Sequence, residues 1–301
     1  MNLIDLQVNG YANVDFSSPS LTFQQLQKAC RVLRQRGTDA FLATIVSSPL
    51  SVYERNIPLI IKGIETDPLI ASMIIGFHLE GPFISPLDGP RGAHDPACVI
   101  AGDVSVMKRL ITLCGPYLKM ITVAPEVARI EQIIEMATDH SVIVSMGHTL
   151  ASPQQIEEAV EKGARCVTHL GNGISAMLDR TDNPIHTFLS IPGLYIMLIA
   201  DGHHLPLPFI KMVIRTCGTH HTIITSDSAP LGSMPPGEYT SLGGKVVLES
   251  DGKLHIPSLG CLAGSSACLS ECADFLLENR IASPSELDEM CFETPKALLD
   301  L

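Results

Sequence analysis

The chain of 301 residues is 46% hydrophobic and only 17% charged, so it can bury a large core. Its 20 lysines and arginines against 32 aspartates and glutamates give a formal net charge of −12. This excess of acidic residues argues against a nucleic-acid partner, because proteins bind the phosphate backbone through a basic surface. No run of eighteen apolar residues would span a bilayer, and the N-terminus enters an apolar strand without a basic leader, so we expect no membrane partner and a cytoplasmic location.

Eight short apolar runs recur along the chain and are typical of buried strands. Amphipathic stretches lie between them, such as residues 22–37, which end on Gly37, and residues 152–163, which begin with Ser-Pro. This alternation predicts a single (β/α)8 barrel domain over residues 1–301. An open doubly wound sheet is the alternative, but no G-x-G-x-x-G turn follows any strand. The predicted strands are 3–8, 40–46, 72–79, 118–124, 141–147, 164–170, 194–200 and 221–226.

The last third of the chain adds elements to this alternation. Residues 237–258 contain two β-like runs around Asp251-Gly252, which predict a β-hairpin insertion after strand eight. Two helices, 265–280 and 283–301, are expected to close the domain. The nine cysteines are odd in number and show no C-x-x-C pair, so we interpret them as reduced core residues. A metal pair of Cys268 and Cys272 on one helix face is the weaker interpretation.

Ionisable side chains follow one predicted strand after another. Strand three ends at Glu80, strand five is followed by His148, and strand six ends near His169. Because the carboxyl ends of barrel strands meet at one face, these three residues form a candidate metal site. Strands seven and eight are followed by Asp201, His203 and His204, and by Asp227, respectively.

The residue types in this set predict a specific chemistry. Two imidazoles and one carboxylate can hold a divalent cation and leave a position open for water, as in catalytic zinc sites. Such a cation lowers the pKa of water to about 7, and a carboxylate across the mouth, Asp227, can then act as general base and general acid. The first strand ends in Gln7 and Asn9 where many related barrels carry His-x-His, which favours one metal over two.

Each residue also has a purely structural interpretation. Taken alone, His148 or His169 is better explained as a hydrogen-bonded core histidine. Only the placement of both at strand ends together with Glu80 favours a metal site. His78 stands two residues before Glu80 and is expected to support the site or belong to the core rather than to bind metal. Gly171-Asn172-Gly173 is explained by a tight turn better than by a phosphate-binding loop.

The motifs as a set resemble one family. "HLEGPF", "GHT", "THLGNGISAM" with Arg180 downstream, "ADGHH" and "TSDSAP" are similar in order and spacing to the N-acetylglucosamine-6-phosphate deacetylases of the amidohydrolase superfamily. The resemblance runs from Ile4 to about Leu299, nearly the whole chain. It implies a barrel enzyme that hydrolyses the N-acetyl group of a phosphorylated amino sugar, releasing acetate and the free amine.

Residue roles follow from the resemblance by matched position. Glu80, His148 and His169 resemble the ligands of a single metal ion, Zn²⁺ in the first place with Fe²⁺ as the alternative, and Asp227 resembles the acid/base. The resemblance further implies a homodimer in which Arg180 and His204 reach the phosphate from the neighbouring subunit. The remaining residues that resemble substrate contacts are His94, Asn172, Gly173, Leu262 and Ala263.

The chain also departs from the family pattern. The segments that build the family's small β-sandwich are not recognisable, so no separate sandwich domain is expected. Asn172-Gly173-Ile174 replaces Asn-Ala-Met, and residues 180–184 replace an Arg-Glu-Pro-Gly segment. These changes border the expected sugar phosphate. They leave open another amidohydrolase acting on a different N-acyl amino sugar or amide, or a sugar-phosphate-binding protein that has lost catalysis.

Overall fold

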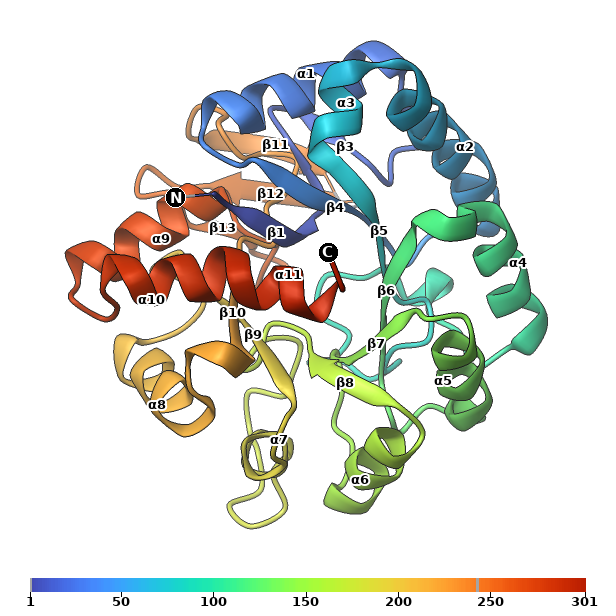
Figure 1. Ribbon diagram of the computed structural model, residues 1–301, viewed down its shortest axis with the longest axis vertical. Coiled ribbons are helices and arrows are strands. Elements are labelled where there is room, and N and C mark those ends of the chain that lie inside the picture. Colours follow the sequence, from blue (N-terminus) through green and yellow to red (C-terminus); the bar gives the residue numbers. More distant parts are fainter. Residues whose placement is uncertain (1, 242–243) are drawn as a thin grey trace.

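The computed structural model describes residues 2–241 and 244–301 and confirms the predicted (β/α)8 barrel (Figure 1). Eight parallel strands form one sheet in chain order, with β1 and β10 at its two edges. Most strand bounds lie within two residues of the predicted ones. The sixth strand differs most and ends at Val167 rather than at 170, because the chain leaves the sheet there to form a site loop. The strands are β1 (Ile4–Val8), β4 (Ala40–Val46), β5 (Ile74–Glu80), β6 (Leu118–Val123), β7 (Ile143–Met146), β8 (Ala164–Val167), β9 (Tyr195–Ile199) and β10 (Thr222–Thr225).

The helices form a ring around the strands (Figure 1). Local signals fix two of the predicted starts: Thr22 with Gln25 and Ser152 with Gln155 each form a capping box. None of the described helices has both the length and the apolar character to cross a membrane. The helices of the barrel are α1 (Phe23–Gln35), α2 (Leu50–Thr66), α3 (Pro68–Met73), α4 (Val104–Cys114), α5 (Ile130–Asp139), α6 (Pro153–Glu161), α7 (Pro184–Ser190) and α8 (Leu207–Cys217), with short 3₁₀ turns η1 (Pro96–Cys98), η2 (Gly115–Tyr117) and η3 (Thr219–His221).

The two predicted closing helices are present with altered bounds. The first, α9 (Leu269–Glu278), begins four residues after the predicted start at 265, because Ser265 belongs to the loop that lines the pocket region. The second is a continuous helical run made of α10 (Pro284–Asp288), the π-helical segment η4 (Glu289–Glu293) and α11 (Thr294–Leu298). Its last residues, Leu298 and Leu299, join the apolar cluster inside the barrel, so α11 closes the end where the strands begin (Figure 1).

The barrel interior and the helix layer bury separate apolar clusters. Side chains alternate along a strand, so one set points to the barrel axis and the other to the helices. The inward cluster contains Ile4, Leu6, Leu42, Met120, Ile143, Cys166, Met197 and Ile223. All of these lie toward the closed end, which leaves the carboxyl ends of the strands free to carry polar groups.

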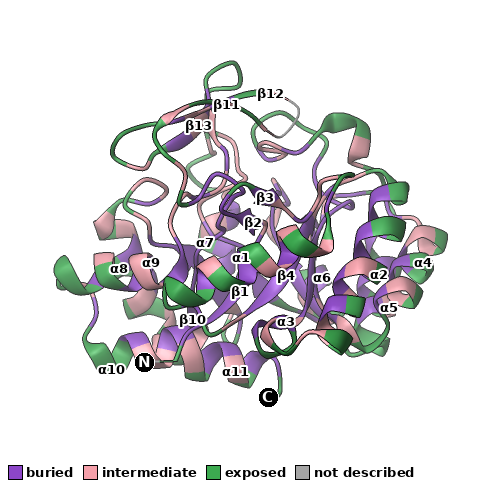
Figure 2. Ribbon diagram, turned by 90° about the horizontal axis from the view of Figure 1, so that it is seen from above, coloured by how far each residue is buried: buried purple, intermediate pink, exposed green. Residues whose placement is uncertain are grey.

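The predicted hairpin is present and belongs to a larger sheet. Strands β12 (Gly244–Leu248) and β13 (Leu254–Ile256) pair antiparallel around Asp251-Gly252, with Glu249 N donating to Lys253 O at 2.9 Å. Strands β11 (Gly237–Ser241) and β14 (Cys261–Leu262) extend it to four strands with a small apolar cluster of their own. This sheet stands above the barrel, on the side opposite α10 and α11 (Figure 2). A short hairpin of β2 (Gly10–Tyr11) and β3 (Val14–Asp15) follows β1.

Candidate metal centre and active site

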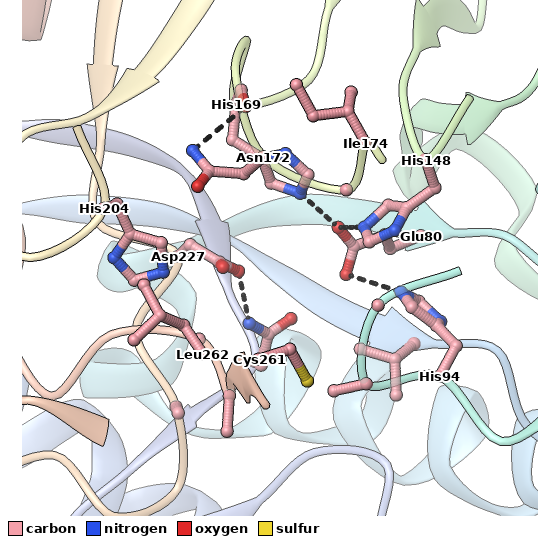
Figure 3. A pocket seen from close by; sticks show the side chains of 18 of the residues that line it. Glu80, His94, His148, His169, Asn172, Ile174, His204, Asp227, Cys261 and Leu262 are labelled. Atoms are coloured by element: carbon pink, nitrogen blue, oxygen red, sulfur yellow. Dashed lines mark hydrogen bonds and ion pairs between the residues drawn. The ribbon is translucent and has the colours of Figure 1, made fainter. Parts of the chain in front are cut away.

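A pocket of about 250 Å³ opens at the carboxyl ends of the strands. Ten of the eleven residues that the sequence predicts for the site line it; Arg180 does not. Figure 3 shows that the labelled side chains converge on this space from several strand ends and from β14. The ten are Glu80, His94, His148, His169, Asn172, Gly173, His204, Asp227, Leu262 and Ala263.

Glu80, His148 and His169 form one compact cluster at the base of the pocket. Glu80 Oε1 lies 3.1 Å from His148 Nε2 and 3.0 Å from His169 Nε2, and each side chain is at most 8% exposed. One ligand atom from each residue lies within 4.8 Å of the others. A carboxylate oxygen and two imidazole nitrogens are a donor set that suits a divalent transition metal and leaves positions free for water or substrate.

The ring of His148 is held in one tautomer. Its Nδ1 donates to the carbonyl oxygen of Pro90 at 2.8 Å, so Nε2 carries the lone pair that faces the cluster. Gly173 packs directly on this ring: a Cβ at that position would lie 2.7 Å from His148 Nδ1. An alanine therefore has no room at this position in this loop conformation.

Three of the site residues have unusual backbone conformations. His148, His169 and Asp227 have φ values of 51°, 28° and 50°, in a region that non-glycine residues rarely occupy. Such strain persists where the surrounding structure imposes it and often accompanies functional sites. The turn after β7, the turn after β8 and the turn after β10 thus bend sharply to aim these side chains into one pocket. No pattern in the sequence predicts these positive φ values.

The amides of the first strand bind the two carboxylates. Gln7 Nε2 lies 2.7 Å from Glu80 Oε1 and 2.9 Å from Asp227 Oδ1, and Asn9 Nδ2 donates to Asp227 Oδ1 at 2.7 Å. The sequence predicted only that these amides are not metal ligands. Their role as hydrogen-bond donors between Glu80 and Asp227 depends on contacts that the sequence does not reveal.

The surroundings of Glu80 and Asp227 shift the pKa values of the two carboxyl groups in opposite directions. Burial alone would raise the pKa of Glu80, but the facing imidazoles of His148 and His169 outweigh it and hold that pKa well below the usual value. Burial, followed by the charge of Glu80, raises the pKa of Asp227 to about 6. Glu80 is therefore suited to remain an ionised ligand, whereas Asp227 can exchange a proton near neutral pH.

His78 lies beneath the cluster and takes no part in it. Its Nδ1 donates to Leu6 O at 3.0 Å, so its Nε2 accepts from the Thr122 hydroxyl at 2.7 Å. Thr122 in turn contacts the Thr168 hydroxyl at 2.7 Å, next to His169. Burial lowers the pKa of His78 to about 4, which keeps the ring neutral. The interpretation of His78 as a buried supporting residue fits these contacts.

The two residues predicted to bind the phosphate, Arg180 and His204, lie in different places in the structure. His204 lines the pocket of its own chain, with Nδ1 donating to Asp201 Oδ2 at 2.8 Å. His204 therefore contributes to the pocket of its own chain, and the expectation that it reaches the site of a neighbouring subunit stays a prediction. Arg180 is exposed in the loop after β8, outside the pocket lining. His203 turns outward, with Nε2 3.1 Å from Asp251 O.

Several pocket residues were missed by sequence reasoning, and Asp15 is the ionisable one among them. Asp15, at the end of β3, lines the pocket and accepts from Ser17 N at 2.7 Å, and burial raises its pKa to about 6. Ile174 also lines the pocket. Asp15 stands 65 residues before Glu80 in a short hairpin without a recognisable site motif, so only the fold brings it here. Cys268 and Cys272 are buried free thiols outside this pocket.

Comparison with known proteins identifies the family. No family model matches the chain. It is 31% identical to N-acetylglucosamine-6-phosphate deacetylase of Bacillus subtilis over 92% of this chain and 69% of that protein, and 27% identical to N-acetylgalactosamine-6-phosphate deacetylase of Escherichia coli O157:H7 over 98% and 76%.

A solved structure confirms the fold independently. A mutant N-acetyl-D-glucosamine-6-phosphate deacetylase from Mycobacterium smegmatis, in complex with N-acetyl-D-glucosamine-6-phosphate, superposes with a TM-score of 0.90 at 23% identity. The match covers 100% of this chain and 77% of that one. With the fold, the strand-end cluster and the sequence identity in agreement, the chain belongs to the N-acetylglucosamine-6-phosphate deacetylase family.

Proposed function

We propose that the protein is a metal-dependent amide hydrolase that converts N-acetylglucosamine 6-phosphate into glucosamine 6-phosphate and acetate. One observation carries the proposal: Glu80, His148 and His169 form a buried ligand cluster in the same pocket as Asp227, a carboxyl whose pKa is raised to about 6. The B. subtilis relative carries this activity in its name, and the M. smegmatis mutant was solved with this sugar phosphate.

The donor set supports one divalent cation held by Glu80, His148 and His169. The tautomer of His148 and the low pKa of Glu80 both present ligand atoms in the form that binds a cation. Bound there, the cation would supply Lewis acidity by lowering the pKa of water to about 7 and polarising a carbonyl oxygen. Mixed nitrogen and oxygen ligands suit Zn²⁺, with Fe²⁺ as the alternative.

The proton transfers fall to Asp227. In the proposed reaction its carboxylate takes a proton as water forms a bond to the acetyl carbon. The same proton then passes to the amide nitrogen as the carbon–nitrogen bond breaks, which yields acetate and the amine. Gln7 and Asn9 both donate to Asp227 Oδ1, which orients the carboxylate and leaves Oδ2 for the proton. His94, kept neutral because burial lowers its pKa to about 3, can donate or accept a hydrogen bond near the acetyl group.

The remaining pocket residues are proposed to hold the sugar. Asn172 and Gly173 offer amide groups, and Leu262 with Ala263 supplies apolar contact on the opposite side. Because the pocket lining contains no lysine or arginine among the described residues, the phosphate needs a cation from elsewhere. We propose that Arg180 of a second subunit supplies it in a homodimer, together with His204 of the same pocket.

The sugar epimer is the second candidate substrate. The E. coli relative is named as a deacetylase of N-acetylgalactosamine 6-phosphate and matches 98% of this chain. The two sugars differ only at one ring hydroxyl. The Gly173 and Ile174 departures lie in the pocket, where they can alter the contacts of the ring.

Acetate release tests both candidates directly. Purified protein, with its metal content measured, is assayed on the 6-phosphates of N-acetylglucosamine and N-acetylgalactosamine and on both unphosphorylated sugars. Acetate from the glucosamine derivative at the highest kcat/KM supports the proposal, and preference for the galactosamine derivative selects the second candidate. Metallated protein that binds the sugar phosphates without releasing acetate would contradict both and indicate a binding protein. An intracellular site of action is proposed from the nine free cysteines, which suit a reducing compartment.

A further inference from the structure

The barrel has a seam between its first and last strands. Among the described residues, the ladder of β1 is formed with β4 and that of β10 with β9, so β1 and β10 lie at the two ends of the strand order. In the part of the chain that the structure describes, one parallel bridge, Val8 with Ser228, joins the two edges beyond the end of β10. Gln7 and Asp227, which contact each other at 2.9 Å, stand on opposite sides of this seam.

Asp5 connects the two sides of the seam with one oxygen atom. It lies in β1 and is 1% exposed. Its Oδ1 accepts hydrogen bonds from Thr225 Oγ1 at 2.7 Å and Ser226 N at 3.1 Å, both on the far side. The same atom accepts from the backbone N of Gln7 at 3.2 Å on its own side.

These contacts place Asp5 behind both partners of the Gln7–Asp227 pair. It binds the backbone of Gln7 itself and that of Ser226, the residue directly before Asp227. We propose that Asp5 is a positioning residue, which fixes Gln7 and Asp227 across the barrel seam so that the proton-transferring carboxylate is held at its working position. This inference rests on the proposed function for its kinetic consequences only.

Burying the Asp5 carboxylate costs desolvation free energy, so a contribution to stability alone does not account for this residue. Its second oxygen, Oδ2, is buried without a hydrogen-bond partner among the described residues, and burial raises the pKa of Asp5. An apolar side chain would fill the space without that desolvation. What an apolar side chain lacks is an acceptor for the three donors that converge on Oδ1.

Two variants of Asp5 separate positioning from packing. Asp5→Asn keeps an oxygen acceptor, whereas Asp5→Leu removes it and keeps the branching and the number of side-chain heavy atoms. Thr44→Val is the matched control, because Thr44 is equally buried and accepts from Val8 N at 3.1 Å on the other flank of β1, away from Asp227. For each protein we would measure kcat and KM for acetate release, bound metal and Tm.

The expected pattern is a loss in kcat that the conservative variant rescues. Asp5→Leu should lower kcat about 10- to 100-fold with KM and metal content close to wild type, because a small misplacement of a reacting group has effects of this size. Asp5→Asn should stay within about threefold of wild type, since its amide oxygen accepts the same bonds. Asp5→Leu with wild-type kcat, an Asp5→Asn variant as slow as Asp5→Leu, or a Thr44→Val variant equally slow would overturn the proposal.

Two further measurements keep the test decisive. If Asp5→Leu does not fold, Thr225→Val removes one donor from the far side and should lower kcat several-fold at constant KM; an unchanged kcat would count against the proposal. If the wild type releases no acetate, the proposed function fails, and crystal structures then decide the positioning. Gln7 Nε2 and Asp227 Oδ1 should separate beyond hydrogen-bonding distance in Asp5→Leu, and an unchanged contact would overturn the inference.

Discussion

Gln7 Nε2 lies 2.9 Å from Asp227 Oδ1 and 2.7 Å from Glu80 Oε1, so one amide of the first strand joins the two buried carboxylates of the site. The partners are 73 and 220 residues away in the chain. The amide donates to both carboxylates from a position to which the sequence had assigned no contact. The first strand therefore contributes hydrogen-bond donors to the site.

Removal of this amide should change the protonation of Asp227. Gln7→Leu deletes a donor that favours the charged form, so the pKa of Asp227 should rise and the acid limb of kcat/KM should move to higher pH. Gln27→Leu is the control, because Gln27 donates to Asp67 at 2.6 Å far from the pocket. A pH profile of Gln7→Leu that superposes on the wild type would show that the amide does not tune Asp227.

Asp227 itself should be required for turnover but not for metal binding. Asp227→Asn removes the group that accepts and returns the proton, and we expect kcat to fall about 10²- to 10⁴-fold. Bound metal, measured by elemental analysis, should stay at the wild-type level because Asp227 is not part of the ligand cluster. Asp139→Asn, at the exposed end of α5 and outside the pocket, controls for the amide substitution. Near-wild-type turnover by Asp227→Asn would remove it from the mechanism.

The pH profile follows from the position of the Asp227 pKa. Burial and the charge of Glu80 raise this pKa to about 6, and the base must be ionised to act, so activity should fall as the pH drops through it. A bound cation offsets the charge of Glu80 and lowers the pKa of Asp227. The acid limb of kcat/KM in the metallated enzyme should therefore have its midpoint at or below pH 6. A midpoint well above that value would assign the limb to another group.

Gly173 should control metal affinity through the ring of His148. In Gly173→Ala the new Cβ would lie 2.7 Å from His148 Nδ1, so the ring must shift, and metal affinity should fall about 10- to 100-fold, as for other changes behind a metal ligand. Gly193→Ala is a matched control: its φ of 83° carries similar backbone strain, but a Cβ there meets nothing within 4 Å. Equal affinities in titrations of the two metal-free variants would contradict this role.

Arg180 tests the proposed dimer. If it acts on the pocket of a second subunit, Arg180→Ala should raise KM for the phosphorylated sugar and leave the unphosphorylated sugar unaffected. Mixing Arg180→Ala with Asp227→Asn under subunit exchange should restore part of the activity, because hybrid dimers pair an intact catalytic group with an intact Arg180. No recovery in verified mixed dimers would place Arg180 outside the neighbouring site.

Local patterns in the sequence were sufficient for the architecture. Apolar runs alternating with amphipathic helices predict the eight strands, and capping pairs such as Ser152 with Gln155 set helix starts, because these signals act between residues a few positions apart. The end of each barrel strand faces the same mouth, so Glu80, His148, His169 and Asp227 could be assembled into one site from their order alone. The structure places all four in the predicted pocket.

The tertiary structure alone decided how those residues are held. Asp5, Gln7 and Asp15 enter the site through partners or neighbours distant in the chain, and no short-range pattern encodes such contacts. It also placed His204 in its own pocket and Arg180 outside it. The sequence by itself determined which side chains stand at the strand ends, because strand periodicity is local. Which of them meet, in which tautomer and with which pKa, was decided by the closure of the barrel, because burial and hydrogen bonding across the seam exist only in the folded chain.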